Sequence, residues 1–168
     1  MKPISILLLL VLLQWSTSCK DSPATTKVSS APTDNLQIER EIDTVKNLVI
    51  QSFEGIWSDL DATKIGQYHT SDFMLLENGV VWTNDSIANY LSRERKEVET
   101  RQYQRLNRFE FHKAVHNQHS IWVAYDNYGT WVKGQDTLGM AHWLESAIAV
   151  KEQGQWKLEQ LHSTAVRK

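Results

Sequence analysis

The chain has 168 residues, of which 41% are hydrophobic and 23% charged, and its formal net charge is −2. This length suits one domain with a sizeable core. The charge balance lacks the basic excess that nucleic-acid binding requires, so no nucleic-acid partner is expected. A single cysteine excludes a disulfide within the chain. The seven tryptophans favour a large aromatic core or an aromatic-lined cavity.

Residues 1–18 have the pattern of a secretory signal peptide. Lys2 supplies the positive start, and residues 4–13 form an almost unbroken apolar run. That run is shorter than the ~20 residues that a membrane-spanning helix needs. Small residues at positions 16–18 then lead to Cys19, the single cysteine of the chain.

A lone cysteine directly after such a segment resembles the lipobox of bacterial lipoproteins. In that family the signal is cut before the cysteine, which then carries the acyl chains that anchor the protein stably. Ser16 departs from the family pattern, which usually has Leu three residues before the cysteine. The resemblance implies a lipoprotein held by Cys19 in the bacterial cell envelope, in the periplasm or at the outer-membrane surface. The alternative is a secreted protein with an incidental cysteine near its cleavage site.

The next segment has almost nothing to bury. Residues 21–33 consist mainly of Ser, Thr, Ala, Pro and Lys, so they cannot offset the entropy of ordering and should form a flexible tether. The expected organisation is a signal peptide at 1–18, a lipidated cysteine and tether at 19–33, and a folded domain at 34–168.

Helices dominate the first half of that domain. Asp34, with Gln37 three residues later as in a capping box, opens a long amphipathic helix that reaches Leu60. Its apolar residues recur at steps of three or four. They are Ile38, Ile42, Val45, Val49, Phe53, Ile56 and Leu60. A short second helix covers residues 61–68, and a third, capped by Thr83 or Asn84, runs to Glu97.

Strands account for the remainder. A small hairpin at residues 72–82 turns at Glu77-Asn78-Gly79 and separates the second and third helices. From Arg101 the apolar residues alternate, and this predicts four long antiparallel strands. Their centres lie in residues 109–115, 121–132, 140–150 and 155–164. The fold class is therefore α+β, with three helices packed on one face of a curved antiparallel sheet.

This order of elements resembles the NTF2-like superfamily. The Gly154-Gln155-Trp156-Lys157-Leu158 sequence followed by His162-Ser163 is similar to its SnoaL-like and DUF4440 branches. The resemblance implies a cone with a cavity between sheet and helices, and homodimers that form through the outer face of the sheet. The superfamily includes isomerases, cyclases, dehydratases and proteins without known activity, so the fold alone does not give the function.

An enzyme of this fold needs a carboxylate base opposite a proton donor in the cavity. The catalytic candidates are His162 together with Glu145 or Asp72. No His-Glu-x-x-His motif, cysteine ligand or Gly-rich phosphate loop is present, so no metal or cofactor is expected. The aromatic and polar residues expected to bind a ligand are Trp57, Tyr68, Trp122, His142, Gln160 and His162.

The last turn decides which of these residues face the cavity. A three-residue loop at 152–154 puts His142 and His162 on the inner face as diagonal neighbours. A two-residue loop at 153–154 instead puts Glu145 directly opposite His162. The three-residue loop is favoured, because it gathers the apolar side chains of both strands on one face. These side chains are Leu144, Ile148, Val150, Trp156 and Leu158.

The sequence leaves open whether the chain is an enzyme, and the lack of a demonstrable catalytic set favours binding. The expected function is a lipid-anchored envelope protein whose domain binds a small, partly apolar ligand or serves as a dimeric accessory module. The alternative is an isomerase, cyclase or dehydratase that uses His162 with Glu145 or Asp72 as acid–base groups.

The anchor gives a direct prediction. Cys19→Ala should move the protein from the detergent phase to the aqueous phase in Triton X-114 partitioning of cell lysates, because no acyl chain can be attached. Ser18→Ala is the matched control and should stay in the detergent phase. Equal partitioning of the wild-type and Cys19→Ala proteins would contradict the lipoprotein assignment.

Overall fold

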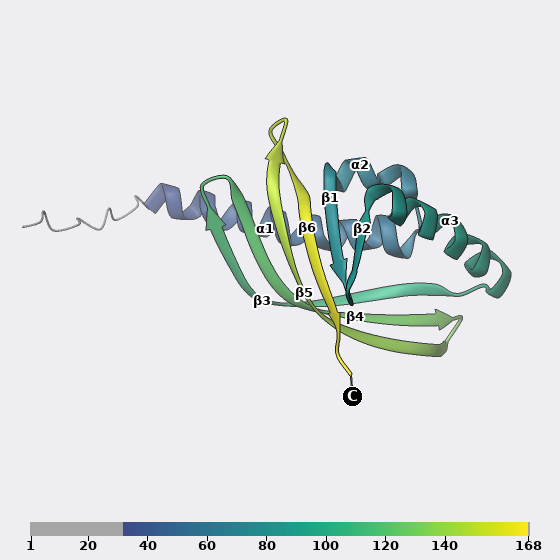
Figure 1. The fold of residues 1–168 in the computed structure, drawn as a ribbon. Coiled ribbons are helices and arrows are strands. Elements are labelled where there is room, and N and C mark those ends of the chain that lie inside the picture. Colours follow the sequence, from purple (N-terminus) through teal and green to yellow (C-terminus); the bar gives the residue numbers. More distant parts are fainter. Residues whose placement is uncertain (1–31, 168) are drawn as a thin grey trace, which may run out of the picture. The chain divides into compact units, whose positions relative to one another are not determined.

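A computed structural model describes residues 32–167 (Figure 1). Within this range three α-helices and two shorter helical segments pack on a curved six-stranded sheet of order β2-β1-β6-β5-β4-β3. The predicted signal peptide, Cys19 and almost all of the tether lie outside the described residues. The mixed α+β class expected from the sequence is confirmed.

The first helix is not one uniform α-helix. The α-helix α1 spans Pro32–Ser52 and begins before the predicted cap at Asp34. A π-helical segment, Phe53–Ser58, continues it. The wider π-helical turn brings residues four apart onto nearly the same side, and the ring centroids of Phe53 and Trp57 lie 6.3 Å apart. The prediction of a single helix to Leu60 was therefore wrong in its last part.

The short connection that follows begins with a capped turn. The Asp61 carboxylate accepts a hydrogen bond of 3.0 Å from the Thr63 backbone N–H and opens a 3₁₀ turn at Ala62–Lys64. The helix α2, Ile65–Tyr68, leads directly into strand β1, His69–Glu77. These short elements carry the chain from the first helical segment into the sheet.

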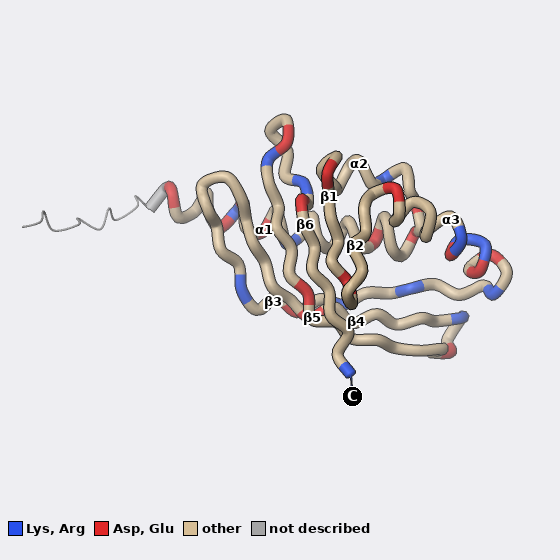
Figure 2. Tube along the Cα trace, in the orientation of Figure 1, with Lys and Arg blue, Asp and Glu red and all other residues tan. Residues whose placement is uncertain are grey.

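The third helix follows strand β2, Val80–Thr83, and spans Asn84–Arg101 as α3. Thr83 is its N-cap, and Thr83 and Ser86 form a capping box, so one of the two predicted caps is confirmed. Acidic and basic residues follow one another along the second half of α3 (Figure 2). Among the described helices, none has the length and apolar character needed to cross a membrane.

The four long strands pair as antiparallel neighbours, as predicted. They are β3 (Gln104–Asn117), β4 (Ser120–Lys133), β5 (Asp136–Glu152) and β6 (Gln155–Ala165). The expectation of a wholly antiparallel sheet was wrong, because β1 pairs in parallel with β6, with Leu75 opposite Leu161. This pairing joins the small hairpin to the long strands in one mixed sheet.

The helices cover one face of this sheet. The helix α1 packs against β3, β4 and β6, and α3 packs against β1 and β2; Figure 1 shows α1 crossing behind β5 and β6. On β5 the inward residues beneath the helices include Ala147 and Ala149, both almost fully buried. Their small side chains leave room for the larger core residues of α1, such as Val45 and Val49.

The β5–β6 turn is a two-residue loop. Glu152 pairs with Gln155, and both Gln153 and Gly154 have positive φ, 52° and 82°. Positive φ at both positions is the signature of a type I′ turn, whose twist matches that of the flanking strands. The favoured three-residue loop was therefore wrong, and the two-residue alternative describes the turn.

A β-bulge then changes the register. Ala149 pairs with Leu158 but Ile148 pairs with Gln160, so Glu159 is the extra residue. Beyond it Glu145 lies opposite Ser163, and the pairing with His162 expected from a two-residue loop is lost. The apolar grouping that favoured the other loop fails as well, because Glu145, Ala147 and Ala149 point inward on β5 while Leu144 is exposed.

Candidate functional site

A pocket lies on the inner face of the sheet, beside the π-helical segment. Its cavity volume is about 40 Å³. Its walls come from the π-helical segment, β1, β3, β5 and β6. The lining residues are Phe53, Trp57, Phe73, Leu75, Glu77, Arg105, Trp143, Glu145, Leu161 and Ser163.

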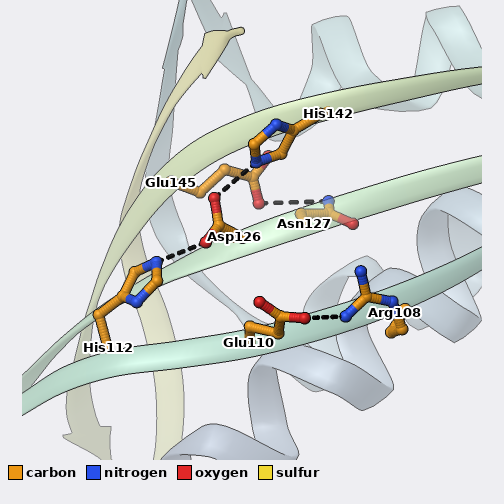
Figure 3. Close-up of polar contacts among 7 residues, drawn as sticks. All are labelled: Arg108, Glu110, His112, Asp126, Asn127, His142 and Glu145. Atoms are coloured by element: carbon orange, nitrogen blue, oxygen red, sulfur yellow. Dashed lines mark hydrogen bonds and ion pairs between the residues drawn. The ribbon is translucent and has the colours of Figure 1, made fainter.

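Glu145 is the buried acid of this pocket. Only 7% of the residue is exposed. The Ser163 hydroxyl donates to Oε1 at 2.9 Å. Asn127 Nδ2 donates to Oε2 at 3.3 Å (Figure 3). Burial raises the pKa of Glu145 to about 7, although hydrogen bonds from Ser163 and Asn127 and the charge of Arg105 favour the ionised form. The carboxyl group is therefore poised to take up or release a proton near neutral pH.

Tyr125 adjoins this carboxyl group from the neighbouring strand. Burial and the Glu145 carboxylate raise the pKa of Tyr125 well above its usual value of 10, so the phenol keeps its proton. Among the described residues, its hydroxyl has no partner that meets hydrogen-bond geometry. Tyr125 is thus a fully buried O–H donor beside Glu145.

Arg105 brings a positive charge into the same pocket from β3. Its Nε donates to Asn107 Oδ1 at 3.0 Å. Asn107 in turn donates through Nδ2 to the Ser58 hydroxyl at 2.8 Å, which ties the guanidinium to the π-helical segment. Burial lowers the pKa of Arg105, but an arginine remains charged at any physiological pH.

Aromatic rings surround the guanidinium. Its Cζ lies 5.8 Å from the ring centroid of Phe53, 5.5 Å from that of Trp131 and 5.1 Å from that of Trp143. Gly129 makes room for this arrangement, since a Cβ there would lie 2.9 Å from the Trp143 ring and 3.5 Å from Arg105 Nε. No carboxylate of residues 32–167 lies within ion-pair distance of Arg105.

Glu77 is a second carboxyl group in the pocket wall. Burial raises its pKa, and the charge of Arg105 opposes that rise. The pocket therefore combines a proton-exchanging acid, a positive charge that can stabilise a developing oxyanion, and apolar walls. This combination suits general acid–base chemistry on a small, partly apolar molecule.

The structure brings together only part of the predicted site. Trp57 and Glu145 both line the pocket. Tyr68 is buried elsewhere, beside Gly55 and Trp156. Asp72 is exposed on β1, so it cannot serve as the base of a cavity enzyme.

The remaining predicted residues lie on the outer face of the sheet. His162 is exposed and pairs with Ser146, so the expected partnership of His162 with Glu145 is wrong. The reason is the bulge at Glu159, which reverses the side-chain alternation of the rest of β6. Trp122, Gln160 and His142 share this outer face.

The outer face has its own polar cluster. Asp126 lies between two imidazoles, with His142 Nε2 at 2.5 Å from Oδ1 and His112 Nε2 at 2.5 Å from Oδ2 (Figure 3). Burial opposes ionisation of Asp126, but hydrogen bonds from His142 and His112 hold its pKa below the usual value. In the part of the chain that the structure describes, no three His, Cys, Asp or Glu residues are grouped to hold a metal ion.

Sequence reasoning missed two main parts of the site. For Arg105 a signal exists: the inward alternation of Phe109 and Phe111, continued back along β3, places Arg105 on the inner face. For Ser163 no such signal exists, because a bulge with an ordinary Glu at the extra position has no sequence signature.

Comparison with known proteins identifies the fold. No family model matches the chain, and no curated protein matches it. An NTF2-like protein with a cystatin-like fold from Novosphingobium aromaticivorans has a TM-score of 0.66 at 8% identity, covering 80% of this chain and 87% of that one. ActVI-ORFA from Streptomyces coelicolor has a TM-score of 0.61 at 17% identity, covering 79% and 98%.

An NTF2-like protein from Cytophaga hutchinsonii is also similar, with a TM-score of 0.54 at 13% identity over 77% of this chain and 98% of that one. Identities this low show the fold and carry no residue roles. The chain has an NTF2-like fold, as the order of its elements predicted.

The raised pKa of Glu145 can be measured directly. Carboxyl-carbon NMR should show one glutamate titrating near pH 7, and Glu145→Gln should remove that signal. The unfolded chain ionises this group near its usual 4.5, whereas the folded chain does so near 7. Between these values the folded state holds more protons, so the free energy of unfolding should fall by about 3 kcal/mol as the pH rises.

The predicted fall in the free energy of unfolding is tested by urea unfolding at pH values below 4.5 and above 7. The wild type should lose stability relative to Glu145→Gln as the pH rises. Parallel pH dependence of the two proteins would contradict the assignment, whatever other groups titrate.

Proposed function

We propose that the inner pocket binds a small, partly apolar molecule and that Glu145 transfers a proton to or from it. The observation that carries this proposal is a buried carboxyl group, with a pKa of about 7, in a pocket that is otherwise mostly apolar. The reaction class would be an isomerisation or dehydration that begins with proton abstraction next to a carbonyl group.

The proposed acid–base set differs from the one expected from the sequence. Glu145 is the proton-transfer group, and Arg105 and Tyr125 are the candidates for stabilising negative charge on the ligand. Phe73, Leu75 and Leu161 offer the apolar surface for the rest of the molecule. The space open to water is about 40 Å³, so a ligand larger than a few water molecules would displace a lining side chain.

Deuterium exchange tests this function. The wild type in D₂O should accelerate exchange of the α-hydrogens of small ketones such as cyclohexanone and 2-tetralone, followed by proton NMR. The rate should rise with pH and level off above an inflection near 7. Glu145→Gln should lower the catalysed rate by a factor of about 10² or more, because the base is lost.

Asp126→Asn is the matched control, because it neutralises a carboxylate that is buried as deeply as Glu145 but lies on the opposite face of the sheet. Its exchange rate should equal that of the wild type. Exchange that survives in Glu145→Gln would eliminate Glu145 as the base.

A second candidate function is that of a dimeric accessory module. It is favoured by exposed apolar residues on the outer side of the long strands: Leu106 is 50% exposed, Met140 74% and Leu144 52%. Such a surface is typical of a protein–protein interface. A second copy of the chain would cover it, and the anchor on Cys19 would hold the pair at the bacterial envelope, periplasmic or on the outer surface.

Sedimentation velocity tests the homodimer. The wild type should sediment as a dimer, and the double substitution Met140→Glu with Leu144→Glu should shift it to the monomer, since the added charges would be buried in the interface. Val81→Glu, at an apolar position 60% exposed on β2, is the control and should leave the dimer intact. A monomeric wild type at micromolar concentration would end this proposal.

A further inference from the structure

We infer that the pocket takes a small organic carboxylate, whose carboxylate group pairs with the terminal nitrogens of Arg105 while its apolar part lies against the pocket wall. This names the ligand class of the site described above, and so it rests on the proposed function. Four observations on Arg105 carry the inference.

The first is that the charge of Arg105 has no counter-ion among residues 32–167. A largely buried charge is normally paired, because removing an unpaired charge from water is strongly unfavourable. Glu77, Glu94 and Glu145 all act on Arg105 through space, yet none of them lies within ion-pair distance. An anion that enters the pocket would supply the missing partner.

The second observation concerns hydrogen-bond donors. The Nε–H of Arg105 is used by Asn107, and no described residue accepts from either terminal nitrogen. Within residues 32–167 the fully enclosed polar side-chain atoms without partners belong to Thr70, Tyr125 and Asn127. The terminal nitrogens of Arg105 are not among them, so these nitrogens keep some accessible surface. Their paired N–H groups match the two oxygens of a carboxylate.

The third observation is access. Arg105 lines the inner pocket and also a second, smaller pocket of about 20 Å³ that is lined by Tyr90, Tyr103 and Trp131. The guanidinium therefore lies between the two spaces. A carboxylate can therefore meet the guanidinium from either pocket, and the body of a ligand held there can extend towards Glu145.

The fourth observation excludes the opposite charge. An aromatic box beside carboxyl groups would also suit a cationic ligand. Here the faces of Phe53, Trp131 and Trp143 are already occupied by the guanidinium itself. A cation would have to displace Arg105 and would then meet its charge nearby, whereas an anion needs no such displacement.

Glu145 links this binding to pH. Its neutral form tolerates a neighbouring anion and its ionised form repels one, so the affinity should fall as the pH rises through about 7. Glu77 and Glu94 are the other acids that act on Arg105, together with the phenol of Tyr90. Burial raises the pKa of Glu77, so its ionisation at higher pH acts in the same direction.

Matched acids and amides test the ligand class. Binding of benzoate and phenylacetate, and of benzamide and phenylacetamide, is measured by titration calorimetry and by the quenching of tryptophan fluorescence. We expect each acid to bind at least about tenfold more tightly than its amide. Arg105→Met should remove that preference, and Glu145→Gln should keep it and weaken its dependence on pH.

Arg108→Met is the matched control. Arg108 lies on the same strand, is exposed on the outer face and also stacks on a ring, with its Cζ 4.0 Å from the ring centroid of Tyr128. This substitution should leave the affinity for the acids unchanged. If circular dichroism shows that Arg105→Met is unfolded, Arg105→Lys replaces it, and the loss of the paired N–H fork should still weaken the preference for the acid.

Two outcomes would overturn the inference. Amides that bind as tightly as acids, with no effect of Arg105 substitution, would reject the carboxylate class. Failure of both acids to bind at about 10 mM would reject it as well. Neither outcome bears on the proton-transfer proposal. That proposal is tested separately, by comparing deuterium exchange of uncharged ketones in the wild type and Glu145→Gln.

Discussion

A carboxyl group and a guanidinium are buried on the same face of one sheet without touching. Contact between Glu145 and Arg105 would form an ordinary buried ion pair, with the carboxylate fixed in its charged form. Separation changes the behaviour of both groups. Burial dominates at Glu145, whose pKa rises to about 7, and Arg105 keeps free N–H donors. The reactivity of the pocket depends on this separation.

The fold maintains the separation through features that lie far apart in the sequence. Asn107 and Ser58 hold one edge of the guanidinium, and the π-helical turn brings Phe53 and Trp57 to the same pocket. The absence of a side chain at Gly129 lets Trp143 lie over the backbone of β4. All of these features position side chains around the Arg105 guanidinium.

The general arrangement could be predicted from the sequence because it depends on periodicity. Apolar residues spaced three or four apart predicted the helices, and alternating apolar residues predicted the long strands. Thr83 was one of two predicted caps for the third helix, and it is the observed N-cap. The site could be predicted only in part, because its geometry depends on register. Glu145, a catalytic candidate from the sequence, lies in the pocket without its expected partner His162. The parallel pairing of β1 with β6 joins segments that no local pattern connects.

The bulge at Glu159 changes which residues of β6 point inward. Every side chain before it follows one alternation and every side chain after it follows the other. Regular pairing of the same residues without the bulge would exchange the two faces of the last part of the strand, turning Ser163 outward and His162 inward, opposite Glu145. Two different chemical sites, a carboxyl group held by a hydroxyl and a carboxylate–imidazole pair, thus differ by one β-bulge in this chain.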